Sequence, residues 1–516
     1  MPSPESSLIA ARLAQLAHER GAQPAITFRG DERKATQHGD HTFTCDFAKF
    51  WRRVERVTAH LQSTWGVQRG DRVAWLGFNH ELQLVTLVAC ARLGAVFLPL
   101  NFRLAVPELQ QVMADAQPGL LVHDSHHTDT AQALHGAGLP RTHHDALIAT
   151  ASPRGLPLPE VQSDLPLLLV YTSGTTGVPK GAVHTQAGLL ANARASQWAH
   201  GFVPGDKVLS TLPLFHVGGL CIQTLPALLA GVEVVLHPRF DPCAWLAEMQ
   251  TSRPTLSLLV PATMRALFEH PRWAESPLAC LRGIMTGSST VPLAYLETLH
   301  ARGVPVGQVY GTTETGPVSI VLRLHEAMAH VGASGWPQPE AQVRLIDPQG
   351  RKVGPGETGE VCIRAANLMR GYWQRDGQTG IGLQDGWFHS GDLGQRAEDG
   401  CITIVGRSKD MVISGGENIY PAEIENLLVT LPGVAECAVV GLPDARWGEV
   451  PVAVLVRSAD ASGQALHADT VLAHLQPRIA RFKLPRRVVF MDTLPKSALG
   501  KVQKPLLQAE LLRTNP

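Results

Sequence analysis

The sequence predicts an α/β protein. A large N-terminal domain of stacked α/β sheets, with a small β-rich subdomain, is followed by a small, mobile α+β C-terminal domain. The first observation behind this prediction is that, up to about residue 400, strand-like apolar runs alternate with helical patterns, as in 72–77, 81–93 and 95–98 and again in 245–249, 255–260 and 262–269. Such alternation is typical of parallel sheets covered by helices. The second is the length: 516 residues correspond to about three units of roughly 150 residues each.

The pattern changes twice in the C-terminal part of the chain. Short strands at 360–364 and 401–405, separated by Gly and Asp turns, predict the β-rich subdomain near 340–406, which completes an N-terminal domain of residues 1–406. Residues 407–516 predict the α+β domain, with a helix near 421–431, strands at 434–440 and 452–456, and a helix near 468–479.

Charge and cysteine usage exclude several classes of protein. Lys plus Arg and Asp plus Glu balance at 45 each, which removes a global electrostatic case for nucleic-acid binding. The first residues show no leader pattern, and the longest apolar stretch, 82–100, is interrupted by arginine, glycine and proline. The 8 cysteines form no CxxC pair, so neither a zinc site nor a disulfide scaffold is expected. We therefore expect a reduced, cytoplasmic protein without a membrane span.

Two polar features stand out from this neutral background. Between residues 478 and 516, nine Lys or Arg are opposed by Asp492 and Glu510 alone, a net charge of +7 (9 − 2). Such a basic end could meet a polyanion or remain a solvated surface. Histidines gather at 123–127 and 143–144. They could bind a metal, but we expect them to lie in solvated loops.

The strongest local signal is the loop YTSGTTGVPKG at 171–181, which follows the apolar run 165–170. Its glycines allow backbone N–H groups to point inward as an anion-binding nest. Its hydroxyls and the Lys180 cation add donors for phosphate oxygens. No Gly-Lys-Ser/Thr closes the loop, so it differs from a Walker A motif. The segment predicts a phosphate-binding loop.

This loop resembles the phosphate-binding signature of the adenylate-forming superfamily, which includes acyl-CoA synthetases, peptide-synthetase adenylation domains and firefly-type luciferases. Further motifs of that family follow in order: LPLFHVGGL at 212–220, VYGTTETG at 309–316, WFHSGDLG at 387–394, GRSKD at 406–410 with GGENIYPAEIE at 415–425, and PKSALGKVQK at 495–504. The chain is thereby identified as a member of the acyl-CoA synthetase branch, the AMP-dependent acid–CoA ligases. The resemblance implies that a carboxylate attacks the α-phosphorus of ATP and releases pyrophosphate. Coenzyme A then takes the acyl group from the adenylate as a thioester and releases AMP.

The resemblance also implies which residues bind ATP and magnesium. Glu314 is the expected Mg²⁺ ligand, and Thr172 would face the same ion. Tyr310 would stack on adenine, and Asp392 would accept hydrogen bonds from the ribose hydroxyls with help from Arg407. The expected ATP-binding residues are Thr172, Ser173, Gly174, Thr175, Thr176, Gly177, Lys180, Gly287, Ser288, Ser289, Tyr310, Gly311, Thr312, Thr313, Asp392 and Arg407.

Three side chains are expected to act during catalysis. Lys501 is the expected adenylation lysine, because a flexible ammonium can reach the substrate carboxylate and the α-phosphate together. Without the motif it could not be chosen over Lys496 and Lys504. Lys409 occupies the family's hinge position, where the C-terminal domain would rotate between the two half-reactions, and His216 would gate the acyl site. After rotation, the CoA channel would be bordered by Ser414, Gly415 and Gly416.

The expected acyl pocket carries no fixed cation; its residues are His216, Val217, Gly218, Gly219 and Gly311. Such a pocket disfavours a second carboxylate and favours a neutral, apolar tail. Glycines 218 and 219 are expected to leave volume for that tail. We therefore expect a medium-chain fatty or aryl carboxylic acid as the substrate.

Three functions remain open at this point. The first is an acid–CoA ligase, and the second is a stand-alone adenylation enzyme that loads a carrier protein. The third is a non-catalytic nucleotide-binding relative, which is disfavoured because all the expected catalytic side chains are present. A luciferase-like oxygenase would share the same adenylate, but no feature of the sequence demands it. The expected partners are a small carboxylic acid and CoA, with a homodimer as a candidate assembly.

Overall fold

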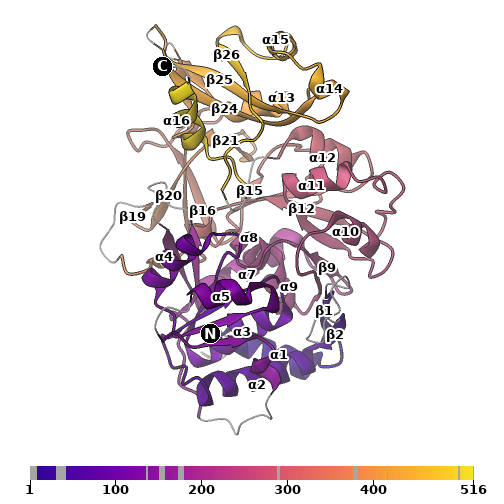
Figure 1. Cartoon of the computed structure of the whole chain (residues 1–516), viewed down its shortest axis with the longest axis vertical. Helices are drawn as coiled ribbons and strands as arrows, with labels where there is room; N and C mark the ends of the chain where they lie inside the picture. The colour runs from indigo at the N-terminus through magenta and orange to yellow at the C-terminus, as the bar shows by residue number, and fades with distance from the viewer. Residues whose placement is uncertain are drawn as a thin grey trace.

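The computed structural model of the chain has two parts of unequal size (Figure 1). It describes residues 8–30, 42–134, 138–149, 157–172, 179–287, 291–375, 382–414, 417–444, 446–497 and 500–514. Three sheets lie in the larger part, and a fourth forms the smaller, C-terminal part. This mixed α/β architecture confirms the fold class expected from the sequence.

The largest sheet places six parallel strands between antiparallel edges. Its order is β15 (Trp336–Pro337), β14 (Ile320–Leu322), β13 (Val306–Tyr310), β12 (Gly283–Gly287), β11 (Leu256–Leu259), β9 (Lys207–Ser210), β10 (Glu233–Leu236), β1 (Pro24–Phe28) and β2 (Phe43–Asp46). Parallel neighbours need crossover connections. Helices in these connections are α9 (Leu225–Ala230), α10 (Pro242–Glu248), α11 (Pro261–Phe268) and α12 (Leu293–His300).

The second sheet has seven strands and holds the phosphate loop at one end. Its order is β18 (Gly371–Tyr372), β8 (Lys180–Thr185), β7 (Pro166–Thr172), β4 (Val96–Pro99), β3 (Arg72–Leu76), β5 (Leu120–His123) and β6 (Arg141–His143). Strands β7 to β6 are parallel, whereas β8 and β18 are antiparallel additions. The helices nearby in the sequence are α4 (Val106–Ala116), η3 (Ser125–His127), α5 (Thr128–Leu134), α6 (Ala146–Ala149) and α7 (Gln186–His200).

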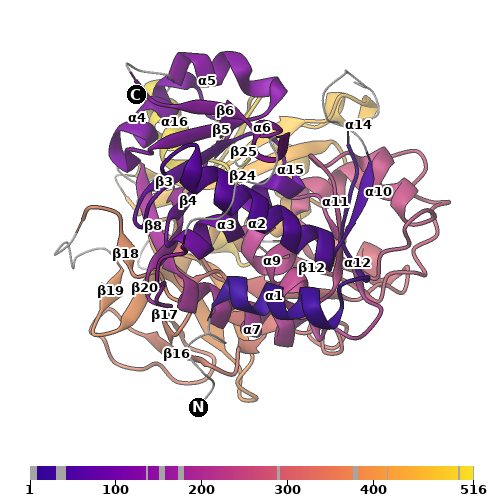
Figure 2. The same cartoon turned by 90° about the horizontal axis from the view of Figure 1, so that it is seen from below.

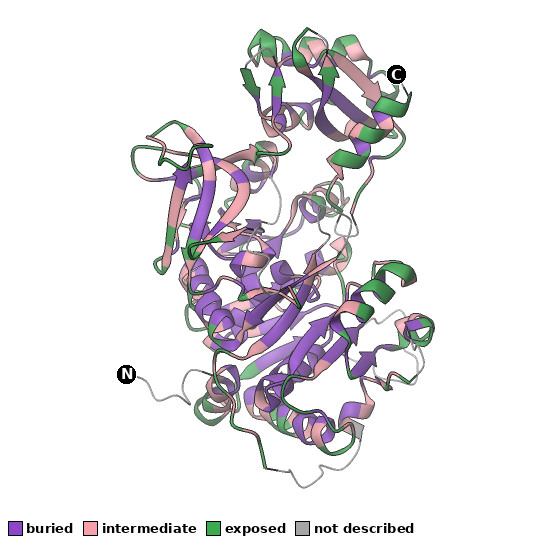
Figure 3. Ribbon diagram, turned by 90° about the vertical axis from the view of Figure 1, so that its left-hand side faces the viewer, coloured by how far each residue is buried: buried purple, intermediate pink, exposed green. Residues whose placement is uncertain are grey.

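One hydrophobic core joins these two sheets. It includes helices α1 (Ile9–Glu19), α2 (Phe47–Ser63) and α3 (Glu81–Leu93), which lie side by side (Figure 2). Helix α3 is buried on nearly all sides, which explains why its sequence is apolar all round. Buried residues therefore concentrate along the strands and inner helices of the larger part (Figure 3).

The third sheet forms a small β-rich layer over the first. It contains β16 (Ala341–Ile346), β17 (Thr358–Ala365), β20 (Trp387–Arg396), β19 (Leu383–Gln384) and β21 (Ile402–Arg407). Its core joins the largest sheet through Ile320 of β14, which packs with Val361 and Ile402. This contact fixes β20 and β21, the strands that carry the expected ribose motif, beside the ends of the parallel strands.

The C-terminal part is a sheet with helices on both faces. Its strands are β23 (Glu417–Ile419), β22 (Val412–Ser414), β25 (Gly448–Arg457), β24 (Val434–Asp444) and β26 (Arg487–Phe490). Side chains alternate along β25: Ala453 and Leu455 face one core, and Val452 and Val454 face the other. The first core contains α13 (Pro421–Leu428) and α15 (Ala468–Leu475), and the second contains α16 (Lys504–Thr514). Short elements elsewhere in the described residues are α8 (Val217–Gly219), the π-helical turn η4 (Leu220–Thr224), η5 (Thr313–Thr315), α14 (Ala461–Gln464) and η6 (Arg481–Lys483).

The elements predicted from sequence pattern are found close to their expected bounds. The strand at 72–77 is β3, the helix at 81–93 is α3, and the helix near 421–431 is α13, which ends at Leu428. None of the helices in the described part of the chain has the length and hydrophobicity that a membrane span requires.

Candidate active site

The expected site residues gather where parallel strands of the largest sheet end. Gly287 and Tyr310 are the last residues of β12 and β13, and His216 lies in the loop after β9. In open α/β sheets, ligands bind outside the carboxyl ends of the strands. Strands β20 and β21 of the third sheet add Asp392 and Arg407, and the C-terminal part adds Lys501.

Asp392 is held by two neighbouring side chains. It is paired with Arg407 across the antiparallel strands β20 and β21, and Arg407 Nε lies 2.9 Å from Asp392 Oδ1. The hydroxyl of Tyr310 donates to Asp392 Oδ2 at 2.8 Å. Burial raises the pKa of Asp392 above its ordinary value, although Arg407, Tyr310 and Lys501 oppose the shift. A carboxylate has about four lone-pair positions, so Asp392 can still accept from a ribose diol.

Tyr310 is anchored by its hydroxyl as well as by its ring. Burial and the nearby Asp392 carboxylate raise its pKa well above the ordinary value, so the phenol keeps its proton and remains a donor. The hydrogen bond to Asp392 links the expected adenine-binding residue to the expected ribose-binding residue. Sequence reasoning had assigned these two side chains separate tasks.

Glu314 has a partner that sequence reasoning missed. The hydroxyl of Tyr372 donates to Glu314 Oε1 at 2.7 Å, and the Lys180 ammonium lies 5.8 Å from the centre of the Tyr372 ring. Tyr372 reaches this place because β18 pairs with β8, the strand that begins at Lys180. The half-buried Glu314 carboxylate keeps its other oxygen for a hard cation, and Mg²⁺ prefers such oxygens together with phosphate and water. The donor set therefore fits the expected ion.

The phosphate loop is described only at its two ends. Thr172 and Lys180 are opposite each other in the β7–β8 pair, and the Thr172 hydroxyl donates to the Lys180 carbonyl at 3.4 Å. Ser173, Gly174, Thr175, Thr176 and Gly177 lie outside the described residues, as do Ser288 and Ser289 of the expected adenine site. Of the described ends, Lys180 lies beside Tyr372, whose hydroxyl donates to Glu314.

Close backbone packing explains two of the expected nucleotide-binding glycines. A Cβ on Gly287 would lie 2.4 Å from the Val309 carbonyl oxygen, and one on Gly311 would lie 1.8 Å from that of Pro317. Thr312 and Thr313 follow in a tight turn, where the Thr312 N–H donates to the Thr315 hydroxyl at 2.9 Å. These contacts hold the loop that carries Glu314.

Lys501 differs from its two neighbouring lysines. Lys496 Nζ lies 2.6 Å from Glu436 Oε2, and Lys504 Nζ lies 2.8 Å from Glu425 Oε1. Lys501 has no ion pair with any residue that the structure describes. It lies at the base of a turn that is closed by hydrogen bonds between Ser497 and Lys501, next to Gly500, which has a φ of +80°. The geometry separates three lysines that could not be told apart without the motif.

The Lys501 ammonium faces the expected nucleotide site from the C-terminal part. Desolvation and the Arg407 charge lower its pKa, whereas Asp392 and Glu314 oppose this shift. The Lys501 charge also lowers the pKa of His216, which belongs to the acyl motif at 212–220. The exposed Lys501 ammonium thus interacts electrostatically with expected ribose, magnesium and acyl residues.

His216 begins the short helix α8 and is neutral. Its Nδ1 accepts a hydrogen bond from the Gly218 N–H at 3.0 Å, which leaves the proton on Nε2. Burial, together with the Lys501 and Arg103 charges, lowers the pKa of His216 to about 4. The residue can therefore offer an Nε2–H donor at neutral pH.

One expectation about the acyl pocket is wrong. A Cβ on Gly219 would lie 2.3 Å from the Pro213 carbonyl oxygen and 2.8 Å from that of Leu212. The space that a side chain on Gly219 would need is therefore filled by backbone carbonyl groups and is not open to a substrate. Val217, Gly218 and Gly219 are all buried.

The expected hinge and CoA residues lie at the start of the C-terminal part. Lys409 is exposed in the turn between β21 and β22, where the Asp410 and Met411 N–H groups donate to the Arg407 carbonyl. Ser414 ends β22 and is buried. Gly415 and Gly416 lie outside the described residues.

Two buried asparagines join the loop that carries Glu314 to the π-helical turn η4, which follows the acyl motif. Asn367 Nδ2 donates to the carbonyls of Thr315 at 2.8 Å and Val318 at 3.0 Å. Asn192 of α7 donates to the Cys221 carbonyl at 2.7 Å and accepts from the Val318 N–H at 3.2 Å. Sequence reasoning missed both residues, because single asparagines outside a motif carry no signal.

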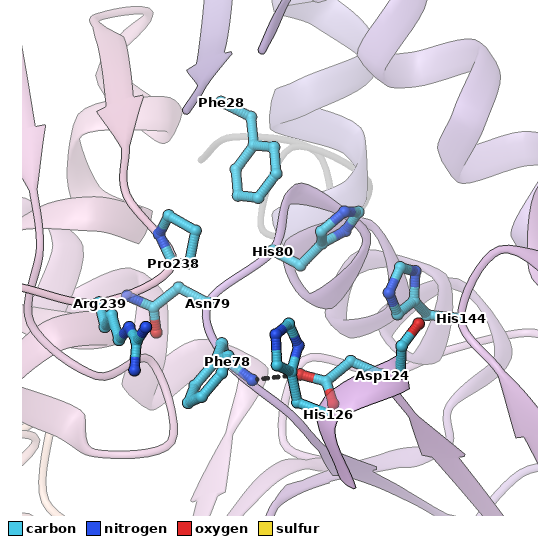
Figure 4. Close-up of a pocket in the computed structure, with 10 residues that line it drawn as sticks. Phe28, Phe78, Asn79, His80, Asp124, His126, His144, Pro238 and Arg239 are labelled. Atoms are coloured by element: carbon cyan, nitrogen blue, oxygen red, sulfur yellow. Dashed lines mark hydrogen bonds between the residues drawn. The ribbon is translucent and has the colours of Figure 1, made fainter. Parts of the chain in front are cut away.

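The histidine-rich stretches are not simply solvated loops, as had been expected. His123 and His144 are buried, and His80, His126 and His144 gather on one side of a pocket between the ends of the two large sheets (Figure 4). Asp124 organises the loop, since its Oδ2 accepts from the Phe78 N–H at 2.8 Å. This pocket contains none of the expected site residues.

Comparison with known proteins shows the family of the chain. Residues 17–373 match the model of the AMP-binding enzyme family, and residues 423–501 match that of the AMP-binding enzyme C-terminal domain. The chain is 45% identical over 466 residues to an indoleacetate–CoA ligase of Aromatoleum aromaticum, covering 87% of this chain and 90% of the relative. It is 43% identical over 471 residues to a feruloyl-CoA synthase of an Amycolatopsis species, covering 91% and 94%.

Solved structures resemble the chain over nearly its whole length. ATP-bound MatB of Rhodopseudomonas palustris has a TM-score of 0.87 at 30% identity, covering 99% of this chain and 100% of that chain. The o-succinylbenzoate CoA synthetase of Bacillus subtilis, in complex with its acyl-adenylate intermediate, has a TM-score of 0.84 at 30% identity, covering 96% and 97%. The same synthetase in complex with ATP and a magnesium ion has a TM-score of 0.83 at 30% identity, covering 97% and 98%.

Proposed function

The chain belongs to the family of AMP-binding enzymes and is an AMP-forming acid–CoA ligase, and we propose that it acts on aryl carboxylic acids. Relatives that are 43–45% identical over most of the chain are ligases of indoleacetate and ferulate, both aryl acids. The uncharged acyl motif of the chain supports the same class. The co-substrates are ATP with Mg²⁺ and coenzyme A.

The first half-reaction joins the acid to AMP. A carboxylate oxygen attacks the α-phosphorus of ATP, the bond to the β-phosphate oxygen breaks, and pyrophosphate leaves. Lys501 would contact both the carboxylate and the α-phosphate and reduce their mutual repulsion. Glu314 and Thr172 would hold Mg²⁺, which neutralises phosphate charge when bound. Asp392 would hold the ribose, with Tyr310 and Arg407 fixing the direction of its carboxylate.

The second half-reaction transfers the acyl group to sulfur. The CoA thiolate attacks the acyl carbon, the acyl–phosphate bond breaks, and AMP leaves. For this step the proposal requires residues 407–516 to rotate at Lys409 relative to residues 1–406, which withdraws Lys501 and brings the loop at 414–416 to the channel. The basic C-terminal segment would then be available to the phosphates of CoA.

The observation that carries this proposal is the placement of Lys501. Its ammonium belongs to the C-terminal part, yet its pKa responds to the charges of Asp392, Glu314 and Arg407 in the larger part. A nucleotide-binding protein without catalytic activity would have no need of such a cation at that point. The arrangement suits adenylation, in which the C-terminal part closes over the nucleotide.

The deciding experiment is ATP–pyrophosphate exchange with a panel of aryl, aliphatic, dicarboxylic and amino acids, repeated with CoA while AMP and thioester are followed. Exchange with aryl acids and CoA-dependent thioester formation are expected. Exchange without thioester formation would indicate that a carrier protein, and not CoA, accepts the acyl group. No exchange with any acid would refute the ligase.

Two finer statements belong to the same proposal. A cytoplasmic location is supported by the eight cysteines, all of which are free thiols. A homodimer is the candidate assembly, and light scattering of the purified protein measures it directly.

A further inference from the structure

We infer that Glu360, Cys362 and His389 form a zinc-binding site on the third sheet, directly beside the strand segment that carries Asp392. The inference goes beyond the ligase reaction, which assigns no role to any of these three side chains. It rests on three ligand groups of different chemistry that two neighbouring strands bring to one point.

Strand pairing places the three side chains on one face of the sheet. Val361 and Ile363 of β17 belong to the core shared with the largest sheet, so Glu360 and Cys362 face the opposite side. His389 of β20 is the antiparallel partner of Cys362, which puts its side chain on that same face. The sequence showed no zinc motif, because the ligands come from two strands and not from a CxxC pair.

The distances between the ligand atoms match a tetrahedral zinc site. His389 Nδ1 lies 3.5 Å from Cys362 Sγ and 3.3 Å from Glu360 Oε2, and the three ligand atoms are all within 4.8 Å of one another. At tetrahedral angles, Zn–S and Zn–N bonds of about 2.3 and 2.0 Å set sulfur and nitrogen about 3.5 Å apart. The corresponding nitrogen–oxygen distance is about 3.3 Å, which is longer than a usual hydrogen bond. An ion can therefore enter this cluster with little movement of the side chains.

The chemistry of the ligands selects zinc over magnesium. A thiolate and an imidazole suit Zn²⁺, whereas Mg²⁺ takes oxygen ligands. Three protein ligands leave the fourth position for water. Burial and the Glu360 charge raise the pKa of Cys362 to about 11, so the thiol keeps its proton without a metal. A zinc ion displaces that proton, because it binds the thiolate.

The surroundings of the cluster allow an ion to enter. Cys362 is fully buried, but the Glu360 and His389 side chains are 29% and 19% exposed, so the cluster opens to solvent on their side. Arg344 of β16 is opposite Cys362, and its charge favours the thiolate by lowering the pKa of the thiol. The thiolate and the Glu360 carboxylate together supply the two negative charges that balance Zn²⁺.

One hydrogen bond joins the cluster to the ribose segment. The Gly391 N–H donates to Glu360 Oε1 at 3.0 Å, while Glu360 Oε2 faces His389. The register of the β17–β20 pair shifts between Glu360 and Cys362, so the segment that carries Asp392 bulges from the ladder. Bulges beside active sites commonly re-aim a side chain. A zinc ion held by Glu360 and His389 would therefore lie directly against this bulge and restrain it.

Metal titration of the full-length protein without nucleotide tests the site. Excess Mg²⁺ is kept present, so that sites made of oxygen ligands alone are filled. We expect one Zn²⁺ to bind per chain. Co²⁺ reports the ligands, because a bound thiolate gives an intense near-ultraviolet charge-transfer band and tetrahedral geometry gives visible bands. Both should appear when Co²⁺ is added and disappear when Zn²⁺ displaces it.

Three variants assign the ligands. Cys362→Ser should lose the thiolate band. Glu360→Gln should weaken Co²⁺ binding by at least about 10-fold, although it keeps an acceptor oxygen for the Gly391 N–H. Cys401→Ser is the matched control, because Cys401 is a buried free thiol directly before β21 of the same sheet and lies outside the cluster. The control should keep both bands.

A second readout locates the ion in the fold. If zinc restrains the bulge, amide hydrogen exchange at residues 389–392 should slow by at least about 3-fold when Zn²⁺ is added to the wild-type protein. Glu360→Gln should reduce this effect at the same Zn²⁺ concentration. Unchanged exchange in the wild-type protein would mean that the ion binds elsewhere.

The outcomes are independent of the ligase assignment, because the titration uses neither ATP nor an acid. A wild-type protein without the thiolate band, or a band that persists in Cys362→Ser, would overturn the inference. Zinc that binds without the thiolate band would place the ion on other ligands, such as His143, His144 and Asp145, and would overturn it as well.

Discussion

The hydroxyl of Tyr310 donates to Oδ2 of Asp392 at 2.8 Å, which links the end of β13 to the middle of β20. Arg407 Nε holds the other carboxylate oxygen at 2.9 Å. The carboxylate is therefore fixed from both sides before any ribose arrives. Preorganisation of this kind lowers the cost of binding.

Tyr310→Phe is expected to weaken ATP binding while preserving the ring. Losing a hydrogen bond to a charged group costs about 1.5–3 kcal/mol, so the KM for ATP should rise about 10-fold or more. ATP–pyrophosphate exchange over a range of ATP concentrations measures it, with Tyr295→Phe on α12 as the control. If Tyr310→Phe keeps the wild-type KM and only Tyr310→Ala raises it, stacking alone accounts for the residue.

Lys501→Ala should separate the two half-reactions. Adenylate formation should fall by about 100-fold or more, because the only cation proposed to bridge the carboxylate and α-phosphate is lost. Thioester formation from supplied acyl-adenylate should continue. Exchange and single-turnover thioester assays measure the two steps.

The neighbouring lysines provide the controls for that experiment. Lys496 and Lys504 form ion pairs with Glu436 and Glu425. Lys496→Ala and Lys504→Ala should therefore cost no more than about 1 kcal/mol of stability and leave adenylation near normal. If either of them abolished exchange while Lys501→Ala did not, the assignment of the adenylation lysine would be wrong.

Tyr372→Phe should change the requirement for magnesium. The phenol holds one oxygen of Glu314 at 2.7 Å, so its loss allows the carboxylate to turn away from the ion. The Mg²⁺ concentration for half-maximal exchange should rise by about 3- to 10-fold, the equivalent of one hydrogen bond. Titration with Mg²⁺ at fixed ATP measures this, and Glu314→Gln should shift it further. A normal magnesium curve for Tyr372→Phe would remove Tyr372 from the metal site.

How much could be predicted from the sequence depends on the distance in the chain between interacting residues. The motifs predict Asp392, Glu314 and Lys501 as site residues, and the charges of Asp392 and Glu314 both act on Lys501. Tyr372 could not be predicted, because it meets Glu314 only through the pairing of β18 with β8, whose residues are about 190 positions apart in the sequence. Long-range pairing of this kind leaves no local pattern.

Burial also misled the sequence interpretation. His123 and His144 were expected in solvated loops, but they lie at or just after the ends of β5 and β6, where the neighbouring elements cover them. Gly219 was expected to leave room for substrate, but a carbonyl oxygen occupies that room. Hydropathy describes the side chain, whereas these outcomes depend on its neighbours.

The buried histidines predict how stability depends on pH. Burial lowers the pKa of His184 and of His200 to about 4 each. An unfolded histidine binds its proton near pH 6.5, so the unfolded state gains protons first as the pH falls. The free energy of unfolding should therefore decrease between pH 6.5 and about pH 4, by about 1–2 kcal/mol per histidine at pH 5.

Urea unfolding at pH 6.5 and at pH 5 measures that loss. His200→Gln should show a smaller difference between the two pH values than the wild-type protein, because it removes one of the buried histidines whose pKa is lowered. His325→Gln is the control, since the His325 side chain is 62% exposed. An unchanged difference in His200→Gln would mean that other groups carry the pH dependence.

Arg265 of α11 provides a test of how the closed arrangement is held. Its guanidinium donates to the carbonyl oxygen of Ala435 in β24, so it joins the larger part to the C-terminal part in the arrangement that places Lys501 at the nucleotide site. A hydrogen bond contributes about 0.5–1.5 kcal/mol net, and this bond exists only while the two parts are closed. Arg265→Ala should therefore shift the population toward other arrangements and slow adenylation by about 2- to 10-fold. Thioester formation from supplied adenylate should be unchanged or faster, because that step requires the closed arrangement to open.

Glu269→Ala is the control, because it removes the exposed partner of Arg265 without changing the bond to Ala435, and it should leave both steps intact. Equal slowing of both steps in Arg265→Ala would instead indicate a general loss of stability.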